Sequence, residues 1–267
     1  MDRSIALMGA ICGDIIGSSY EYWRARTKNY NFNPFPPSAR FTDDTVMSIA
    51  VADWIMHGGD LAKVMQKWGR KYPNAGFGGM FRQWLTEEDP KPYNSFGNGS
   101  AMRVSAVGCA FYTLDETLQK AKESAEVTHN HPEGIKGAQA TASAIFLATI
   151  GRTKEEIKEY ISETFGYDLN RTCDGIRPKY EFDVTCQGSV PESIICFLES
   201  KDYEDCVRLA VSMGGDADTM GAIAGSIAAA YYGEIPETIL EKCWSKLPED
   251  IKGIIENFIQ FNQRETF

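Results

Sequence analysis

The feature that most constrains this chain is a pair of carboxylates just before a long apolar stretch near its C-terminal end. Asp216 and Asp218 follow Gly214-Gly215 and precede a run of small apolar residues, 222–232. Residues two apart do not share a helix face, so these carboxylates converge only where the chain turns. The glycine pair supplies the backbone freedom for that turn. The sequence therefore predicts a helix over 218–232, with Asp216 or Asp218 near its N-cap.

A second stretch repeats this arrangement. Asp43 and Asp44 lie between two threonines, just before an apolar helical pattern over 46–55. One interpretation is capping, because Asp and Thr favour the N-cap, although one acid per helix would suffice. The other is a shared site, in which four converging carboxylates repel one another unless cations lie between them. Oxygen ligands without Cys or His suit Mg²⁺, Mn²⁺ or Ca²⁺ rather than Zn²⁺. Spacing alone leaves both interpretations open.

A glycine-containing loop precedes another helix. Gly97-Asn98-Gly99-Ser100 is expected to present backbone N–H groups toward one point, as a phosphate or diphosphate requires. The same residues also make ordinary turns and caps. The loop is neither a Walker loop nor a Rossmann fingerprint, because no Gly-Lys-Ser/Thr follows it and no predicted strand precedes it.

Three further side chains stand out from their surroundings. Asp14 interrupts an apolar helical pattern over 5–16, and we expect it to hydrogen-bond a neighbouring helix end; support of a metal ligand from behind is the alternative. Glu21 follows that helix among aromatic residues, where a raised pKa suits an acid or base; an exposed glutamate is the alternative. His129 lies in a joint over 128–132, where substrate contact and simple packing or capping are both open.

Nearly every periodic stretch is helical. Glycines at 9, 13 and 17 would share one face of the first helix and allow another helix to approach closely. No repeat or domain boundary is visible, so we predict one all-α domain over residues 1–267. An irregular segment, 166–188, is long enough to be functional. The remaining helices are predicted over 61–71, 77–85, 104–112, 115–127 (capped by Asp115), 133–150, 153–165 (capping box Thr153/Glu156), 189–199 (capping box Ser189/Glu192), 202–212 (capped by Asp202), 236–246 and to about 263.

Composition limits the classes of partner. The net charge of −10 over 267 residues argues against nucleic-acid binding through a basic face. No apolar run approaches the ~20 residues of a membrane span, and the N-terminus lacks signal-peptide features. Seven scattered Cys without a CxxC indicate reduced, buried thiols. We expect a cytoplasmic, monomeric protein that binds neither nucleic acid nor membrane.

Together these stretches, in this order, resemble the ADP-ribosylglycohydrolase family. The resemblance covers most of the chain, from residue 9 to about 232, and the ordered set is more specific than any single motif. The stretches are Gly13-Asp14-Ile15-Ile16-Gly17 leading to Glu21, Thr42-Asp43-Asp44-Thr45, Gly97-Asn98-Gly99-Ser100-Ala101-Met102-Arg103, Thr128-His129 and Gly214-Gly215-Asp216-Ala217-Asp218-Thr219.

The resemblance implies a fold and a set of site residues. It implies an orthogonal helix bundle with a dinuclear Mg²⁺ centre, sometimes Mn²⁺, in a cleft. The implied metal ligands are Thr42, Asp43, Asp44, Asp216, Asp218 and Thr219. The implied catalytic residues are Glu21, Asp44 and Asp216, and the implied substrate-binding residues are Gly97, Asn98, Gly99, Ser100 and His129.

The implied activity is hydrolysis of the glycosidic bond between ADP-ribose and an acceptor, which is a protein side chain or a small molecule. One alternative is a two-metal phosphoester hydrolase, although the chain has no His-Asp metal signature. Another is a non-catalytic ADP-ribose-binding module, against which the retention of Glu21 and all six ligand types weighs. The chain has its own loop at 166–188, which leaves the acceptor linkage open.

Overall fold

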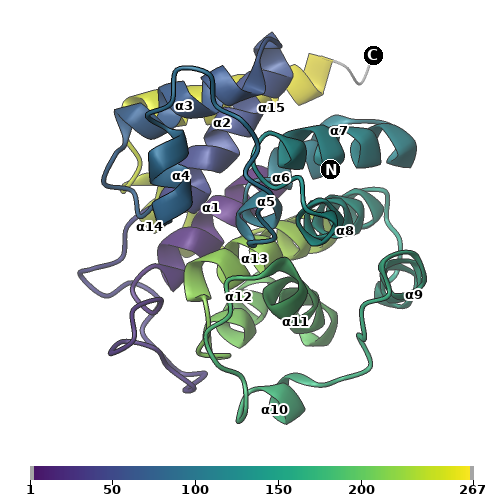
Figure 1. Cartoon of the computed structure of the whole chain (residues 1–267). Helices are drawn as coiled ribbons and strands as arrows, with labels where there is room; N and C mark the ends of the chain where they lie inside the picture. Colours follow the sequence, from purple (N-terminus) through teal and green to yellow (C-terminus); the bar gives the residue numbers. More distant parts are fainter. Residues whose placement is uncertain (1–2, 265–267) are drawn as a thin grey trace.

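The computed structural model describes residues 3–264, and its elements are helices (Figure 1). Within that range there is no strand, and one isolated antiparallel bridge pairs Gly97 with Thr185. The predicted all-α fold is confirmed. The single domain over 1–267 stays a prediction, and its first two and last three residues lie outside the described part. The helices are α1 (Ile5–Gly17), α2 (Asp43–His57), α3 (Leu61–Lys71), α4 (Gly79–Trp84), α5 (Gly99–Met102), α6 (Ser105–Ala110), α7 (Leu114–Glu126), α8 (Pro132–Thr149), α9 (Lys154–Phe165), α10 (Cys173–Ile176), α11 (Cys186–Glu199), α12 (Tyr203–Val211), α13 (Ala217–Tyr232), α14 (Glu237–Trp244) and α15 (Glu249–Arg264).

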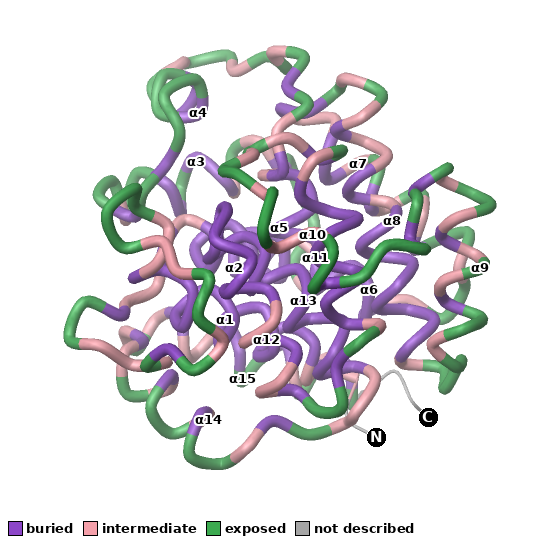
Figure 2. The backbone as a smooth tube through the Cα atoms, turned by 90° about the horizontal axis from the view of Figure 1, so that it is seen from below, coloured by how far each residue is buried: buried purple, intermediate pink, exposed green. Residues whose placement is uncertain are grey.

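Helices α1 and α13 form the centre of the molecule (Figure 1), and both are buried along almost their whole length (Figure 2). A Cβ placed on Gly13 would lie 2.0 Å from the carbonyl oxygen of Gly221, so the two backbones are in direct contact there. Farther along, Gly17 meets the carbonyl of Ala217 and Gly9 meets that of Gly225. The helices are therefore antiparallel, and the end of α1 lies at the beginning of α13.

Asp14 attaches the start of α2 to this central pair. Its carboxylate is fully buried and accepts four hydrogen bonds from two threonines. Thr42 donates through its backbone N–H at 2.9 Å and its hydroxyl at 2.7 Å, and Thr45 does so at 3.1 and 2.5 Å. The expected hydrogen bond from Asp14 to a neighbouring helix end is confirmed. The end of α1 and the beginnings of α2 and α13 consequently meet in one place.

Several local predictions are confirmed and two are wrong. The Thr153/Glu156 capping box and the Asp202 cap are present. Asp115 does not cap α7, because the hydroxyl of Thr113 already accepts from the backbone N–H of Glu116.

The second capping box, Ser189/Glu192, does not form. The bridge between Gly97 and Thr185 fixes the chain there, so α11 begins at Cys186 and Thr185 is its cap. The carboxylate of Glu192 accepts from Arg171 at 2.5 Å instead. Short helices α5 and α10 were not predicted, and α10 lies inside the segment 166–188.

All seven cysteines are buried and free, as expected for reduced thiols. The sulfurs of Cys173 and Cys196 lie 3.9 Å apart. Across residues 3–264, none of the helices combines the length and apolar character that a membrane span requires.

Candidate active site

Five carboxylates line one cavity where the three helix ends meet. The cavity has a volume of about 280 Å³, and its acidic side chains come from α2, from the start of α13 and from the segment after α1. The four aspartates that were predicted to converge all contribute to its wall. The acids are Glu21, Asp43, Asp44, Asp216 and Asp218.

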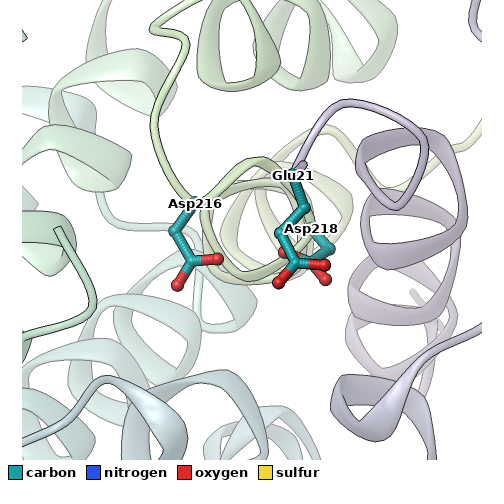
Figure 3. Close-up of side chains that lie close together, drawn as sticks. All are labelled: Glu21, Asp216 and Asp218. Atoms are coloured by element: carbon teal, nitrogen blue, oxygen red, sulfur yellow. The ribbon is translucent and has the colours of Figure 1, made fainter. Parts of the chain in front are cut away.

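The tightest group of acids includes a residue that the sequence had not placed among the metal ligands. Glu21, Asp216 and Asp218 each offer an oxygen atom that lies within 4.8 Å of the other two. Figure 3 shows the three carboxylates directed into a common space, two from the start of α13 and one from the segment after α1. The antiparallel packing of α1 on α13 explains this convergence, because Glu21 follows α1 by a few residues.

Capping does not occupy these carboxylates. At α2 the cap is Thr42, whose side-chain oxygen accepts from the backbone N–H of Asp44 at 3.3 Å. At α13 the residue in the N-cap position is Asp216, but its carboxylate caps no backbone amide. It accepts a hydrogen bond from Asn98 instead, with Nδ2 and Oδ2 2.7 Å apart. Asp218 does accept from a backbone N–H, that of Thr219, with Oδ1 2.9 Å from the nitrogen. Neither the Asp44 nor the Asp216 carboxylate is used by a helix cap, so both remain available to a ligand in the cavity.

Burial and mutual repulsion raise the pKa values of these acids. Burial, together with the neighbouring charge of Asp14, raises the pKa of Asp43 to about 7. Burial and the charge of Asp14 raise the pKa of Asp44 well above its ordinary value. Burial and the charges of Asp44 and Asp216 do the same for the pKa of Asp218. For Glu21, burial raises the pKa first and the charge of Asp216 adds to it. A positive charge among these carboxylates would offset the penalty.

The residues present fit a divalent cation. Oδ1 of Asp44 is buried and has no hydrogen-bond partner among the described residues, as expected of an oxygen that coordinates a metal ion. The three acids of the tight group supply oxygen only, which suits Mg²⁺ or Mn²⁺.

The two threonines predicted as ligands differ in position. Thr219 lies in the cavity wall, whereas Thr42 is buried behind it. The Thr42 hydroxyl donates to Asp14 at 2.7 Å and lies 3.4 Å from Oδ2 of Asp44. Because its proton is used by Asp14, the oxygen presents its lone pairs to other groups.

The predicted substrate residues are brought together except for one. Gly97, Asn98, Gly99 and His129 line the cavity. Ser100 does not, because its side chain is fully buried and its hydroxyl donates to the carbonyl of Gly134 at 2.7 Å. Ser100 therefore holds α5 on α8.

Other cavity residues escaped the sequence reasoning. Phe182 and Val184 line the cavity and belong to the segment 166–188. Aromatic residues in an otherwise polar loop could have indicated that this segment contacts a ligand. Lys28 fixes this segment beside the acidic turn. Its ammonium group donates to the carbonyls of Arg177, Tyr180 and Met213 at 2.7, 2.5 and 2.5 Å. Arg103 also lines the cavity. A single charged residue in the sequence did not indicate that position.

Comparison with known proteins places this chain in a family. The family model for ADP-ribosylglycohydrolases matches residues 4–265, and the chain belongs to that family. It is accordingly a hydrolase. A solved structure titled ADP-ribosylglycohydrolase-related protein complex superimposes with a TM-score of 0.73, with 24% identity and 98% of each chain covered, and it shows the same fold.

Two relatives are named for an activity. The chain is 24% identical to ADP-ribosylhydrolase ARH3 of Homo sapiens over 89% of this chain and 87% of that protein. It is 26% identical to ADP-ribosylarginine hydrolase Tri1 of Pseudomonas putida over 90% of this chain and 74% of that protein.

Proposed function

We propose that this enzyme releases ADP-ribose from an ADP-ribosylated acceptor by hydrolysing the glycosidic bond, with divalent cations held by the acid cluster. The observation that carries the proposal is the convergence of Glu21, Asp216 and Asp218 within 4.8 Å, in the cavity of a chain of this family. Two-metal phosphoester hydrolysis and ADP-ribose binding without turnover remain the competing functions.

The proposed cation ligands are Thr42, Asp43, Asp44, Asp216, Asp218 and Thr219, holding two Mg²⁺ ions, with Mn²⁺ as a substitute. Bound there, the cations would polarise ribose hydroxyls and orient a water. The donor Asn98 keeps the Asp216 carboxylate in one orientation. Asp14 does the same for Thr42. Partners of this kind set the geometry of ligands before any ion arrives.

Glu21 is the proposed proton-transfer residue. It lies at the cavity wall, it is partly buried, and its pKa is raised by burial and by Asp216. Hydrolysis at the anomeric carbon passes through an oxocarbenium-like state, which needs a base for water or an acid for the leaving group. Asp44 and Asp216, the other two proposed catalytic residues, would act through the cations that they hold.

Gly97, Asn98 and Gly99, with His129, are proposed to hold the diphosphate and the nearby ribose. The backbone N–H groups of Gly97 and Asn98 already donate to Ser95 Oγ and to the Val184 carbonyl, so the N–H of Gly99 is the loop amide proposed to donate to the ligand. Phe182 and Val184 border the same cavity and are exposed, so they are placed to contact the acceptor. The name of the bacterial relative makes arginine-linked ADP-ribose the first acceptor to test. Every residue of the site comes from one chain, so a monomer would be complete. Its buried free thiols suit a cytoplasmic location.

The test supplies Mg²⁺ and a panel of ADP-ribosylated substrates with arginine, serine and other linkages, and identifies the products. Release of free ADP-ribose from at least one linkage supports the proposal. Release of AMP or phosphate would assign phosphoester hydrolysis instead, and binding without turnover would assign a binding module. The linkage hydrolysed fastest identifies the acceptor.

A further inference from the structure

Arg103 is a buried cation without a counter-charge. Its side chain is 1% exposed and lines the cavity, yet it forms no ion pair with a carboxylate among residues 3–264. Its Nε is buried and has no hydrogen-bond partner in the described part of the chain. Burial lowers its pKa to about 10, which leaves it charged at neutral pH. A buried charge that lacks a partner costs free energy, so a partner is expected to arrive from outside.

The Arg103 charge also differs in sign from the acids around it in the cavity wall. Five acids line its wall, and Arg103 is the one Lys or Arg among the described residues that do so. ADP-ribose carries a diphosphate, and an acid-lined cavity repels it. A fixed positive charge on the side of the Gly-x-Gly loop would offset that repulsion locally.

Arg103 is also joined to His129 through one hydroxyl. Its Nη2 donates to the Ser124 carbonyl at 2.7 Å and to Oγ1 of Thr128 at 2.9 Å. The same Oγ1 lies 2.7 Å from Nδ1 of His129. A guanidinium group only donates, so the buried Thr128 hydroxyl must use its own proton on an acceptor. Nδ1 of His129 is the acceptor within reach.

This chain of contacts determines where His129 carries its proton. If Nδ1 were protonated, the Thr128 hydroxyl would face two donors and have nowhere to donate, which is costly in a buried site. The neutral ring therefore carries its proton on Nε2. That nitrogen lies against the glycine loop, since a Cβ on Gly99 would be 3.1 Å from it and one on Gly97 3.5 Å. An N–H donor of His129 thus lies beside Gly97 and Gly99 at the cavity wall.

We propose that Arg103 is a positioning residue for the diphosphate of ADP-ribose, because it fixes His129 as an Nε2–H donor through Thr128 and places a positive charge behind it. The identity of the ligand rests on the proposed function. The hydrogen-bonded arrangement of Arg103, Thr128 and His129 does not depend on that function.

The first test measures the histidine tautomer by ¹⁵N NMR on the full-length protein, which has only three histidines to assign. The wild type should show a protonated Nε2 and an unprotonated Nδ1 at His129. Thr128→Ser should keep this state, and Thr128→Val should lose it. Thr141→Val is the matched control, because Thr141 is also buried but its hydroxyl has no hydrogen-bond partner among the described residues. A wild-type ring protonated on Nδ1 would overturn the proposal.

The second test compares the binding of ADP-ribose with that of adenosine, which has no diphosphate. Arg103→Met should weaken ADP-ribose binding about 10- to 100-fold, as for loss of a charged hydrogen-bonding group, and should leave adenosine binding unchanged. Thr128→Val, which keeps the charge, should weaken ADP-ribose binding by less. Equal losses for the two ligands in both variants would show a merely structural role and overturn the proposal.

The two tests also separate this inference from the proposed function. If the wild type bound no ADP-ribose, the proposed ligand would be wrong and the diphosphate role would fall with it. The NMR result, with Arg103→Met measured beside the Thr128 variants, would then still decide whether Arg103 and Thr128 fix the tautomer of His129.

Discussion

Asn98 donates a hydrogen bond of 2.7 Å to Asp216, a residue 118 positions farther along the chain. Its amide nitrogen also lies 3.2 Å from the hydroxyl of Ser189 on α11. One side chain thus links the glycine loop, the acidic turn before α13 and a third helix. The loop proposed to hold the diphosphate and the acids proposed to hold metal are therefore one connected unit.

This link predicts that Asn98 tunes metal affinity. Asn98→Ala should weaken Mg²⁺ binding about 10- to 100-fold while the protein stays folded, because a partner that orients a ligand typically contributes that much. Calorimetric titration of the chelated protein measures the change. Asn31→Ala, at an exposed asparagine that does not line the cavity, is the control and should bind like the wild type. If Asn98→Ala titrated identically to the wild type, the positioning role would be rejected.

The raised pKa of the acids predicts how pH and metal act together. The pKa of Asp43 is raised to about 7, against about 4 for an unfolded aspartate. Asp43 therefore holds its proton more tightly in the folded state than in the unfolded state. Its favourable contribution to folding stability is fully present below about pH 4 and is lost as the pH rises through about 7. The chelated protein should melt at a lower temperature at pH 8 than at pH 5.5.

Metal should reverse that trend, because cations compete with protons for the same oxygens. We expect Mg²⁺ to raise the melting temperature more at pH 8 than at pH 5.5. Thermal scans with Mg²⁺ or chelator at both pH values measure this. An equal gain at the two pH values would contradict a shared acid site.

The contact between α1 and α13 predicts a strong asymmetry between two glycines. Gly13→Ala should destabilise the protein by about 1–3 kcal/mol or more, since the added Cβ would lie 2.0 Å from a backbone oxygen. Gly253→Ala on α15 meets nothing within 4 Å and should stabilise by about 0.5–1 kcal/mol. Chemical denaturation measures both. A neutral Gly13→Ala would show that the helices are less closely packed.

Glu21 should affect turnover without affecting binding. Glu21→Gln keeps the size of the side chain but removes its ionisable proton, so turnover should fall about 10²- to 10⁴-fold. ADP-ribose binding and Mg²⁺-dependent stabilisation should be largely retained, because the substitution keeps an oxygen beside Asp216 and Asp218 and the proposed cation ligands are other residues. Near-wild-type turnover would make Glu21 a surface or gating carboxylate and assign the proton transfer to a metal-bound water with one of the aspartates.

Much of this arrangement could be predicted from the sequence, since the helices, the glycine face of α1 and the acids at two helix starts are local patterns. What could not be predicted depends on packing between distant segments. Glu21 joins Asp216 and Asp218 only because α1 and α13 run antiparallel in one register. Ser100 is buried because α8 lies against α5. The start of α11 is set by a bridge to Gly97, which no helix signal contains.

The central claim is that the converged acids hold divalent cations that the release of ADP-ribose requires. The most direct measurement strips metal with a chelator, restores Mg²⁺ and follows free ADP-ribose from the best substrate of the linkage panel. Release of ADP-ribose by the wild type should stop after chelation and recover when Mg²⁺ is restored. Asp216→Asn should release little ADP-ribose with or without Mg²⁺. Full release by the chelated wild type, or a wild-type response to Mg²⁺ in Asp216→Asn, would contradict the account.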